Sequence, residues 1–359
     1  MQEHLSASIK SQLISVKSGL SIVYFLLFSC FISGCATHFA AHDLSRYNSS
    51  LVWPAPPQTP RIQLLTCIST PADLGINKSW VKRTIDTLFG KEELQEILLR
   101  PYGVYVNSGK LYVTDPGARI LHVFDFRKKN YFSIRDTGSE EFQSPIGVAA
   151  DNNGEIYMTD SMLKKVLVFN SEGEYLRAIG SSDEFKRPTG IAISGDRVYI
   201  IDTHAHHVLI YNKYGRFLFS FGKNGSQKGE FNYPTNIFID KNGILYITDS
   251  MNFRVQIFDR DGNFLSTFGK LGDGSGDLSK PKGIAVDSEG HIYVADALFD
   301  TVQIFNRDGK LLLGFGNTGK EQGRMILPAG VFIDQDDRIY LADSYNRRIQ
   351  VFQYLKEKE

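Results

Sequence analysis

Three histidines in one short stretch form the densest group of candidate metal ligands in this chain of 359 residues. His204, His206 and His207 lie within four positions of one another, and neutral imidazole is a common ligand of zinc and other transition metals. When the stretch is aligned with a related one further along the chain, however, His206 and His207 take the places of Phe253 and Arg254. No other histidine occupies an equivalent position. We therefore expect no metal site here.

A glycine-rich loop and a set of recurring aspartates are the other candidates for chemistry. Residues 272–277 read Gly-Asp-Gly-Ser-Gly-Asp, and alternating oxygen ligands could hold Ca²⁺. Neither the bidentate glutamate of a calcium loop nor the Gly-Lys-Ser/Thr of a phosphate loop follows, so we expect neither ligand. The recurring aspartates are Asp115, Asp160, Asp202, Asp249, Asp296 and Asp343. We interpret them as acceptors for backbone N–H groups in the loops that follow. We expect no cofactor, no metal and no catalytic residue, because HExxH, CxxC and GxSxG motifs are also missing from the sequence.

Each of these aspartates belongs to a repeat. It follows, by 14 or 15 residues, a proline that begins the pattern Pro-x-Gly-Ile/Val-x-Val/Ile or a close variant, and an aromatic residue comes nine positions after it. The repeat prolines are Pro101, Pro145, Pro188, Pro234, Pro281 and Pro328, at intervals of 44, 43, 46, 47 and 47 residues. A fixed period in this range predicts a repeat fold.

Each repeat is typical of four short strands, rich in Val, Ile, Tyr and Phe and separated by turns such as Asn-Gly and Asp-Gly. Six such units predict an all-β fold, a six-bladed β-propeller of four-stranded antiparallel blades. The last repeat lacks a fourth strand, whereas residues 61–68 read as a strand without a partner. We expect this N-terminal strand to close the ring and remove an exposed sheet edge. A small helical insertion is predicted over residues 77–99, either packed on the propeller or acting as a lid or partner-binding helix.

The first residues have the pattern of a secretory signal. Lys10 and Lys17 precede an apolar run over residues 20–32, which ends in Ile-Ser-Gly-Cys35. This ending resembles the bacterial lipobox. It implies a signal peptide over residues 1–34 and a lipid on Cys35, with an uncleaved anchor as the alternative. Ala36 follows the cysteine, and the resemblance favours the outer membrane, with the side of the membrane left open.

Residues 35–60 are polar and then proline-rich, which predicts an extended tether. Beyond the tether, we expect residues 61–355 to form the propeller. Cys67 is the only other cysteine after Cys35, so we expect no disulfide framework and interpret Cys67 as a packed residue. The net charge is zero, which predicts no nucleic-acid partner. We expect a monomer.

Strand order predicts that the loops between second and third strands, together with the blade-to-blade connections, are longer than the other turns and share one face of the disc. Binding usually resides in variable loops on a rigid scaffold. We expect the residue after each repeat proline to surround the mouth of the central channel on this face. The predicted binding residues are Tyr102, Thr189, Asn236, Lys282, Phe299 and His204. We expect Tyr102, Lys282 and Phe299 to be the energetic anchors.

Residues 249–258 and 343–352 resemble NHL repeats, as does the glycine-rich connection over residues 222–231. Proteins with this repeat include protein-binding modules, RNA-binding domains, sensor domains of bacterial receptors and a peptide-amidating lyase. The resemblance implies the fold and leaves the function open. We expect a lipid-anchored, non-catalytic propeller of the cell envelope that binds a protein or peptide. The alternative is a metal-dependent enzyme of the lactonase or lyase type.

Overall fold

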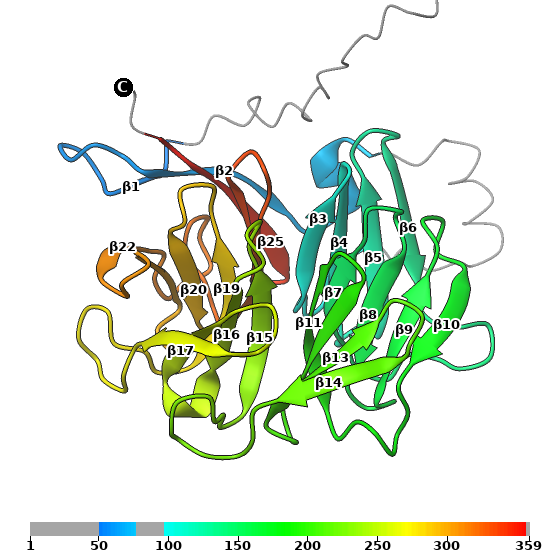
Figure 1. Cartoon of the computed structure of the whole chain (residues 1–359). Coiled ribbons are helices and arrows are strands. Elements are labelled where there is room, and N and C mark those ends of the chain that lie inside the picture. Colours follow the sequence, from blue (N-terminus) through cyan, green and yellow to red (C-terminus); the bar gives the residue numbers. More distant parts are fainter. Residues whose placement is uncertain (1–49, 77–96, 357–359) are drawn as a thin grey trace, which may run out of the picture. The chain divides into compact units, whose positions relative to one another are not determined.

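The computed structural model of the chain describes residues 50–76 and 97–356. Within these residues, the backbone forms six antiparallel sheets arranged as blades. Neighbouring blades also touch through their first strands, which surround a central channel. The predicted all-β six-bladed propeller is therefore confirmed (Figure 1).

The strands follow the repeat in order. The first strands are β3 (Val104–Asn107), β7 (Pro145–Ala150), β11 (Pro188–Ser194), β15 (Pro234–Ile239), β19 (Pro281–Val286) and β23 (Pro328–Ile333). The second strands are β4 (Lys110–Asp115), β8 (Ile156–Asp160), β12 (Arg197–Asp202), β16 (Leu245–Asp249), β20 (Ile292–Asp296) and β24 (Arg338–Asp343). The third strands are β5 (Ile120–Asp125), β9 (Lys165–Phe169), β13 (His207–Asn212), β17 (Arg254–Phe258), β21 (Thr301–Phe305) and β25 (Arg348–Tyr354). The outer strands are β6 (Asn130–Ile134), β10 (Tyr175–Ile179), β14 (Phe217–Phe221), β18 (Phe264–Phe268), β22 (Leu311–Phe315) and β2 (Ile62–Ile68).

The sixth blade is completed from the amino-terminal side. β2 pairs antiparallel with β25, from Ile62 opposite Tyr354 to Ile68 opposite Ile349, and the two strands lie side by side in Figure 1. Burial alternates along β2 because one face of the strand packs on the blade. The predicted closing strand is thus confirmed.

The structure adds a fifth strand to this blade. β1 (Val52–Trp53) pairs with β2, and the Trp53 ring lies 6.0 Å from Phe315 and 5.8 Å from Phe352, measured between ring centroids. The end of the predicted 35–60 tether therefore packs on the propeller instead of continuing as a free spacer. The physical reason is that the Trp53 side chain has a large apolar surface, which is removed from water when the ring packs against two phenylalanine rings.

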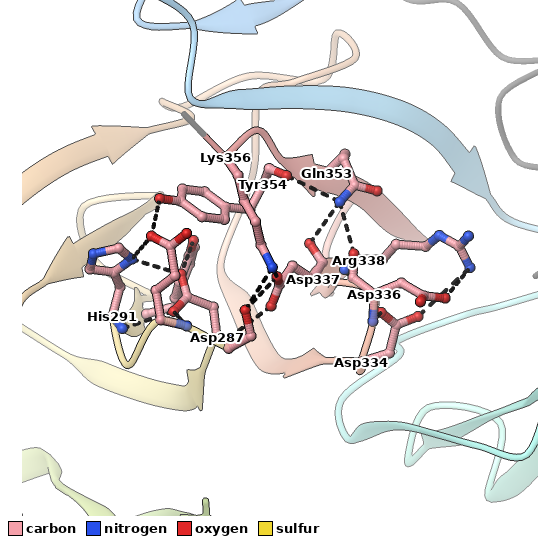
Figure 2. Close-up of polar contacts among 12 residues, drawn as sticks. Asp287, His291, Asp334, Asp336, Asp337, Arg338, Gln353, Tyr354 and Lys356 are labelled. Carbon is pink, nitrogen blue, oxygen red and sulfur yellow. Dashed lines mark hydrogen bonds and ion pairs between the residues drawn. The ribbon is translucent and has the colours of Figure 1, made fainter. Parts of the chain in front are cut away.

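Side chains at the end of β25 bind the turns between first and second strands, on the face opposite the blade-to-blade connections (Figure 2). Lys356 Nζ lies 2.8 Å from Asp337 Oδ2 and 2.9 Å from Ser288 Oγ. The Tyr354 hydroxyl donates to Glu289 Oε2 at 2.8 Å. The acceptors lie in the turns between the first and second strands of blades five and six. These bonds therefore join the two blades beside the strand pair β2 and β25 that closes the ring.

The innermost strands approach one another closely on the channel side. A Cβ added to Gly147 would collide with the carbonyl oxygen of Thr189 in the next blade. Thr159, on the second strand of the same blade, donates its hydroxyl to that carbonyl at 2.6 Å. Thr114 makes the equivalent bond to Ile146 at 2.6 Å. The repeat glycine is needed for this approach because the space beside it is filled by the backbone of the next blade.

Two expectations need comment. The loops between second and third strands have four residues each, within the range of 2 to 5 residues for the other turns inside a blade, whereas the five blade-to-blade connections that lie wholly within the described residues have 8 to 12. Four residues suffice because each loop is a compact turn tied to the repeat aspartate. The predicted helix falls largely on residues 77–96, outside the described residues; just before them is a short 3-10 helix, η2 (Pro71–Leu74). A second short 3-10 turn is η4 (Ser250–Asn252). None of the described helices is long and apolar enough to span a membrane.

We predict that Leu64→Ala lowers the free energy of unfolding by about 2–5 kcal/mol, because Leu64 on β2 is buried in the core between blades five and six. Urea denaturation of the full chain measures the change. Leu312→Ala, on the exposed side of the outer strand β22, is the matched control and should shift stability by no more than about 0.5 kcal/mol. Equal effects of the two substitutions would mean that β2 does not hold the ring closed.

Candidate functional site

The face that carries the blade-to-blade connections is organised by the six repeat aspartates. Each is fully buried and accepts backbone N–H groups from the connection that enters its own blade. Asp160 is representative: its carboxylate accepts from Gln143 at 2.8 Å, Ser144 at 3.0 Å, and Met162 and Leu163 at 3.0 Å. The predicted bonds to the loop after the strand are present at Asp115, Asp160, Asp202 and Asp296, and the connection before the blade is bound as well. Asp249 and Asp343 instead accept one backbone N–H from the connection and bonds from Asn, Arg and Gln side chains.

Blades four and six add an arginine to this arrangement. Arg254 Nε lies 2.8 Å from Asp249 Oδ2, and Arg348 Nε lies 2.8 Å from Asp343 Oδ2. Both guanidinium groups also donate to backbone carbonyls of the neighbouring connection, as Arg348 does to Arg324 at 2.9 Å. Both guanidinium groups are therefore occupied by contacts within the propeller and are not available to bind a ligand.

The central channel contains a cavity of about 180 Å³ that extends from this face, here called the mouth face, toward the opposite end of the first strands. Its wall is mainly aliphatic, with hydroxyl and amide groups near the mouth. Residues that line it include Tyr102, Ile146, Thr189, Thr235, Asn236, Ile237, Ile284, Val331 and Phe332. The cavity is smaller than the 300–1,000 Å³ usual for sites of drug-sized ligands, and is about right for a single side chain.

Two of the predicted binding residues meet across the mouth. Lys282 Nζ lies 5.3 Å from the centroid of the Tyr102 ring, although the two residues come from blades five and one, which are not neighbours. Burial raises the pKa of the Tyr102 hydroxyl, and the positive charge of Arg187 opposes that shift. Burial, assisted by the charge of Lys280, lowers the pKa of Lys282 to about 8. A lysine in such a setting carries its charge at neutral pH without a counterion.

The other predicted residues divide between wall and loops. Thr189 lies in the channel wall, but its hydroxyl is engaged by Thr203 Oγ1 at 2.7 Å and Thr235 O at 3.2 Å, so it supports the scaffold. Asn236 lines the cavity, and its amide oxygen accepts from Ile237 N at 2.8 Å. Its amide nitrogen has no partner among the described residues.

Phe299 and His204 lie away from the cavity, in the loops between second and third strands. The three histidines do not form a ligand set: His204 Nε2 lies 3.3 Å from Arg187 Nη1, while His206 Nδ1 accepts from Tyr233 N at 3.1 Å. In the described part of the chain no three His, Cys, Asp or Glu side chains gather closely enough to hold a metal ion. Cys67 is partly buried on β2, and burial raises the pKa of its thiol to about 11.

A set of exposed residues was not anticipated from the sequence. The position two residues after the repeat aspartate, at the top of each short loop, carries a large apolar side chain in four blades. These residues, here called the loop ring, are Met162 (70% exposed), Met251 (47%), Leu298 (63%) and Tyr345 (57%). The exposed His204 holds the same position in blade three. One exposed apolar residue is unremarkable, but four at one repeat position on one face form a candidate interaction surface. Aligning the repeats by their aspartates would have revealed it.

Aromatic side chains also meet inside the channel. Tyr105 and Phe332 have ring centroids 4.5 Å apart, and Phe332 and Phe238 are 6.4 Å apart. All three come four residues after their repeat proline, where the other blades have alanine. All three residues line the cavity, so their rings form an aromatic part of its wall.

Three known families match separate parts of the repeat region. The family described as 6-bladed beta-propeller matches residues 180–252, the SMP-30/Gluconolactonase/LRE-like region matches residues 232–315, and the NHL repeat matches residues 326–352. No curated protein matches the sequence.

Many solved structures share the fold. A streptogramin B lyase is 12% identical with a TM-score of 0.53, over 72% of this chain and 94% of the lyase. An auxiliary nutrient binding protein from Bacteroides thetaiotaomicron is 14% identical with a TM-score of 0.56, over 72% and 70%. A gluconolactonase from Xanthomonas campestris is 15% identical with a TM-score of 0.55, over 72% and 86%. At such identities the likeness concerns the fold alone. The chain is a six-bladed β-propeller, and its last blade carries an NHL repeat.

We predict that Lys282 reacts with amine-directed reagents at lower pH than exposed lysines do. Its pKa of about 8 makes the neutral, nucleophilic amine dominant above that pH, whereas an unperturbed lysine needs a pH near 10.4. Limited acetylation between about pH 6 and 10, followed by peptide mass spectrometry, measures the midpoint. Lys241, in an exposed turn on the opposite face, is the internal standard. Identical midpoints for the two residues would contradict the prediction.

Proposed function

We propose that this chain is a non-catalytic binding module that captures a protein or peptide on its mouth face. The observation that carries the proposal is the loop ring, because apolar side chains held outward by rigid turns expose surface that water solvates poorly. The aspartate bonds fix those turns, so that little conformational entropy is lost on binding. Aromatic and methionine side chains are typical of the energetic centres and adaptable parts of such surfaces.

A metal-dependent enzyme is the second candidate. It is favoured by the match of residues 232–315 to the SMP-30/Gluconolactonase/LRE-like region, and by the fold shared with a lyase and a gluconolactonase. The binding proposal is preferred because the ionisable groups found at the mouth are cations and a tyrosine, which do not form an acid–base pair around neutral pH. Metal analysis of the purified chain, with a lactone hydrolysis assay before and after chelation, separates the two candidates.

We also propose that the protein is held in the bacterial envelope, at the outer membrane, by a lipid on Cys35. The lipobox pattern at the end of the apolar run supports this. Residues 1–49 lie outside the described residues. A lipid on Cys35 would be separated from β1 by residues 36–51 of the sequence.

We predict that replacing Met162, Leu298 and Tyr345 together by serine weakens binding of peptides selected on the wild-type protein by about tenfold or more, or about 1.4 kcal/mol. Peptides are selected from a displayed random library on the full chain, and affinities are measured by biolayer interferometry. The matched control replaces Leu176, Leu265 and Leu312 by serine; these are 44%, 50% and 49% exposed on outer strands. Equal loss in both variants, or none in either, would exclude the loop ring as the binding surface.

We predict that Cys35→Ala abolishes lipid attachment, because the thiol is the acceptor, and shifts the protein out of the membrane fraction or stalls its processing. Intact-protein mass and membrane fractionation of the full chain are the measurements. Cys67→Ala is the control and should leave both unchanged, since that thiol lies partly buried in the closing strand. Unaltered mass and fractionation of the Cys35 variant would refute lipidation.

A further inference from the structure

Four cationic side chains lie around the mouth of the channel. The residue before the repeat proline is a cation in blades one, three and five, namely Arg100, Arg187 and Lys280, and all three are exposed. Lys282 adds a fourth cation, partly buried beside Tyr102. In the other three blades the position before the proline is uncharged: Ser144, Tyr233 and Leu327.

These cations have no carboxylate partner among the described residues. No ion pair joins Arg100, Arg187, Lys280 or Lys282 to a carboxylate within the residues that the structure describes. Arg100 lies 5.4 Å from the ring centroid of Tyr345, and Arg187 Nη1 lies 3.3 Å from His204 Nε2. The six repeat aspartates at this end of the strands are buried and occupied by backbone amides. Charges held together without counterions favour an anion from outside.

Polar donors beside the cations point to the same ligand. The Tyr102 hydroxyl and the Asn236 amide nitrogen have no acceptor among the described residues, and both residues line the cavity. Lys282, Tyr102 and Asn236 come from blades five, one and four, so the donors reach the mouth from different sides of the ring. A carboxylate, which accepts several hydrogen bonds at once, matches this set.

Directly below the donors, the wall becomes apolar. Ile237, Ile284 and Val331 line a cavity of about 180 Å³, and a dry cavity of about 150 Å³ already holds benzene. An internal Asp or Glu would carry its charge into this apolar wall, at a high desolvation cost. A carboxy-terminal residue instead holds its carboxylate and its side chain on one Cα, so the carboxylate can stay at the cationic mouth while an apolar side chain fills the cavity.

We infer that the mouth binds the free carboxy terminus of a peptide whose last residue is apolar or aromatic. The inference rests on the proposed function and names the part of the partner that enters the channel. The loop ring then contacts the residues that precede that terminus, which continue outward across the mouth face. Capture of a terminal carboxylate by converging donors is an established mode of peptide recognition.

The test uses fluorescence anisotropy with the full chain and a labelled pentapeptide that ends in phenylalanine, as the free acid and as the carboxamide. The acid should bind at least about tenfold more tightly, equivalent to about 1.4 kcal/mol. Lys282→Gln should remove this preference, whereas Lys241→Gln, on the opposite face, should keep it. Raising the pH through about 8 should weaken binding of the acid to the wild type, because Lys282 loses its charge, and should leave the Lys282→Gln variant unaffected.

Equal binding of acid and carboxamide would overturn the inference, and so would a preference that survives Lys282→Gln. The proposed function would still stand if library peptides bind through the loop ring without preference for a free terminus. 3-Phenylpropanoate, which has the same carboxylate and ring without a peptide, is the last arm. If it competes as tightly as the pentapeptide, the ligand is a small organic acid and the assignment to a peptide terminus falls.

Discussion

The structure depends on burying six carboxylates at one end of six sheets. A buried charge without partners costs more free energy than a domain of this kind can supply. Four of the carboxylates are satisfied by backbone N–H groups of the connection and the loop, and those of Asp249 and Asp343 by one backbone N–H and by Asn, Arg and Gln side chains. Hydrogen bonds to a charged group contribute roughly 1.5–3 kcal/mol each, and Asp160 accepts from four residues. The same bonds that stabilise the carboxylates fix the position of every connection, and so shape the mouth face.

Close packing at the centre follows from the same geometry. The first strands converge on the channel, and glycine is required where the backbone of one blade meets the next, as at Gly147 against Thr189. Blade four has Asn236 at the equivalent position, and this side chain enters the cavity wall. A residue other than glycine at this repeat position therefore changes the channel wall directly, because the position faces the channel.

Residues of similar chemistry have different roles: some stabilise the scaffold, and others are available to bind a ligand. Arg254 and Arg348 are held by buried aspartates and backbone carbonyls, so they stabilise connections. Burial and the charge of Lys280 lower the pKa of Lys282, its Nζ lies over the Tyr102 ring, and no carboxylate among the described residues pairs with it, so its charge is available. The same division separates Thr189, whose hydroxyl is bonded to neighbouring blades, from the exposed side chains of the loop ring.

The repeat, the number of blades and the closing strand could be predicted from residue types and spacing, and so could the loop bonds of four of the six repeat aspartates. These follow from spacing and from residue types that act within one repeat. The sequence also indicated Tyr102 and Lys282, since both depart from their repeat position. Only the tertiary structure decided that these two meet across the mouth, that Thr189 is engaged by its neighbours, that Phe299 and His204 lie outside the cavity, and that Trp53 binds the sixth blade. Contacts between blades depend on ring closure, which sets the distance and direction of side chains far apart in the chain, and the spacing of residues within a repeat does not contain that information.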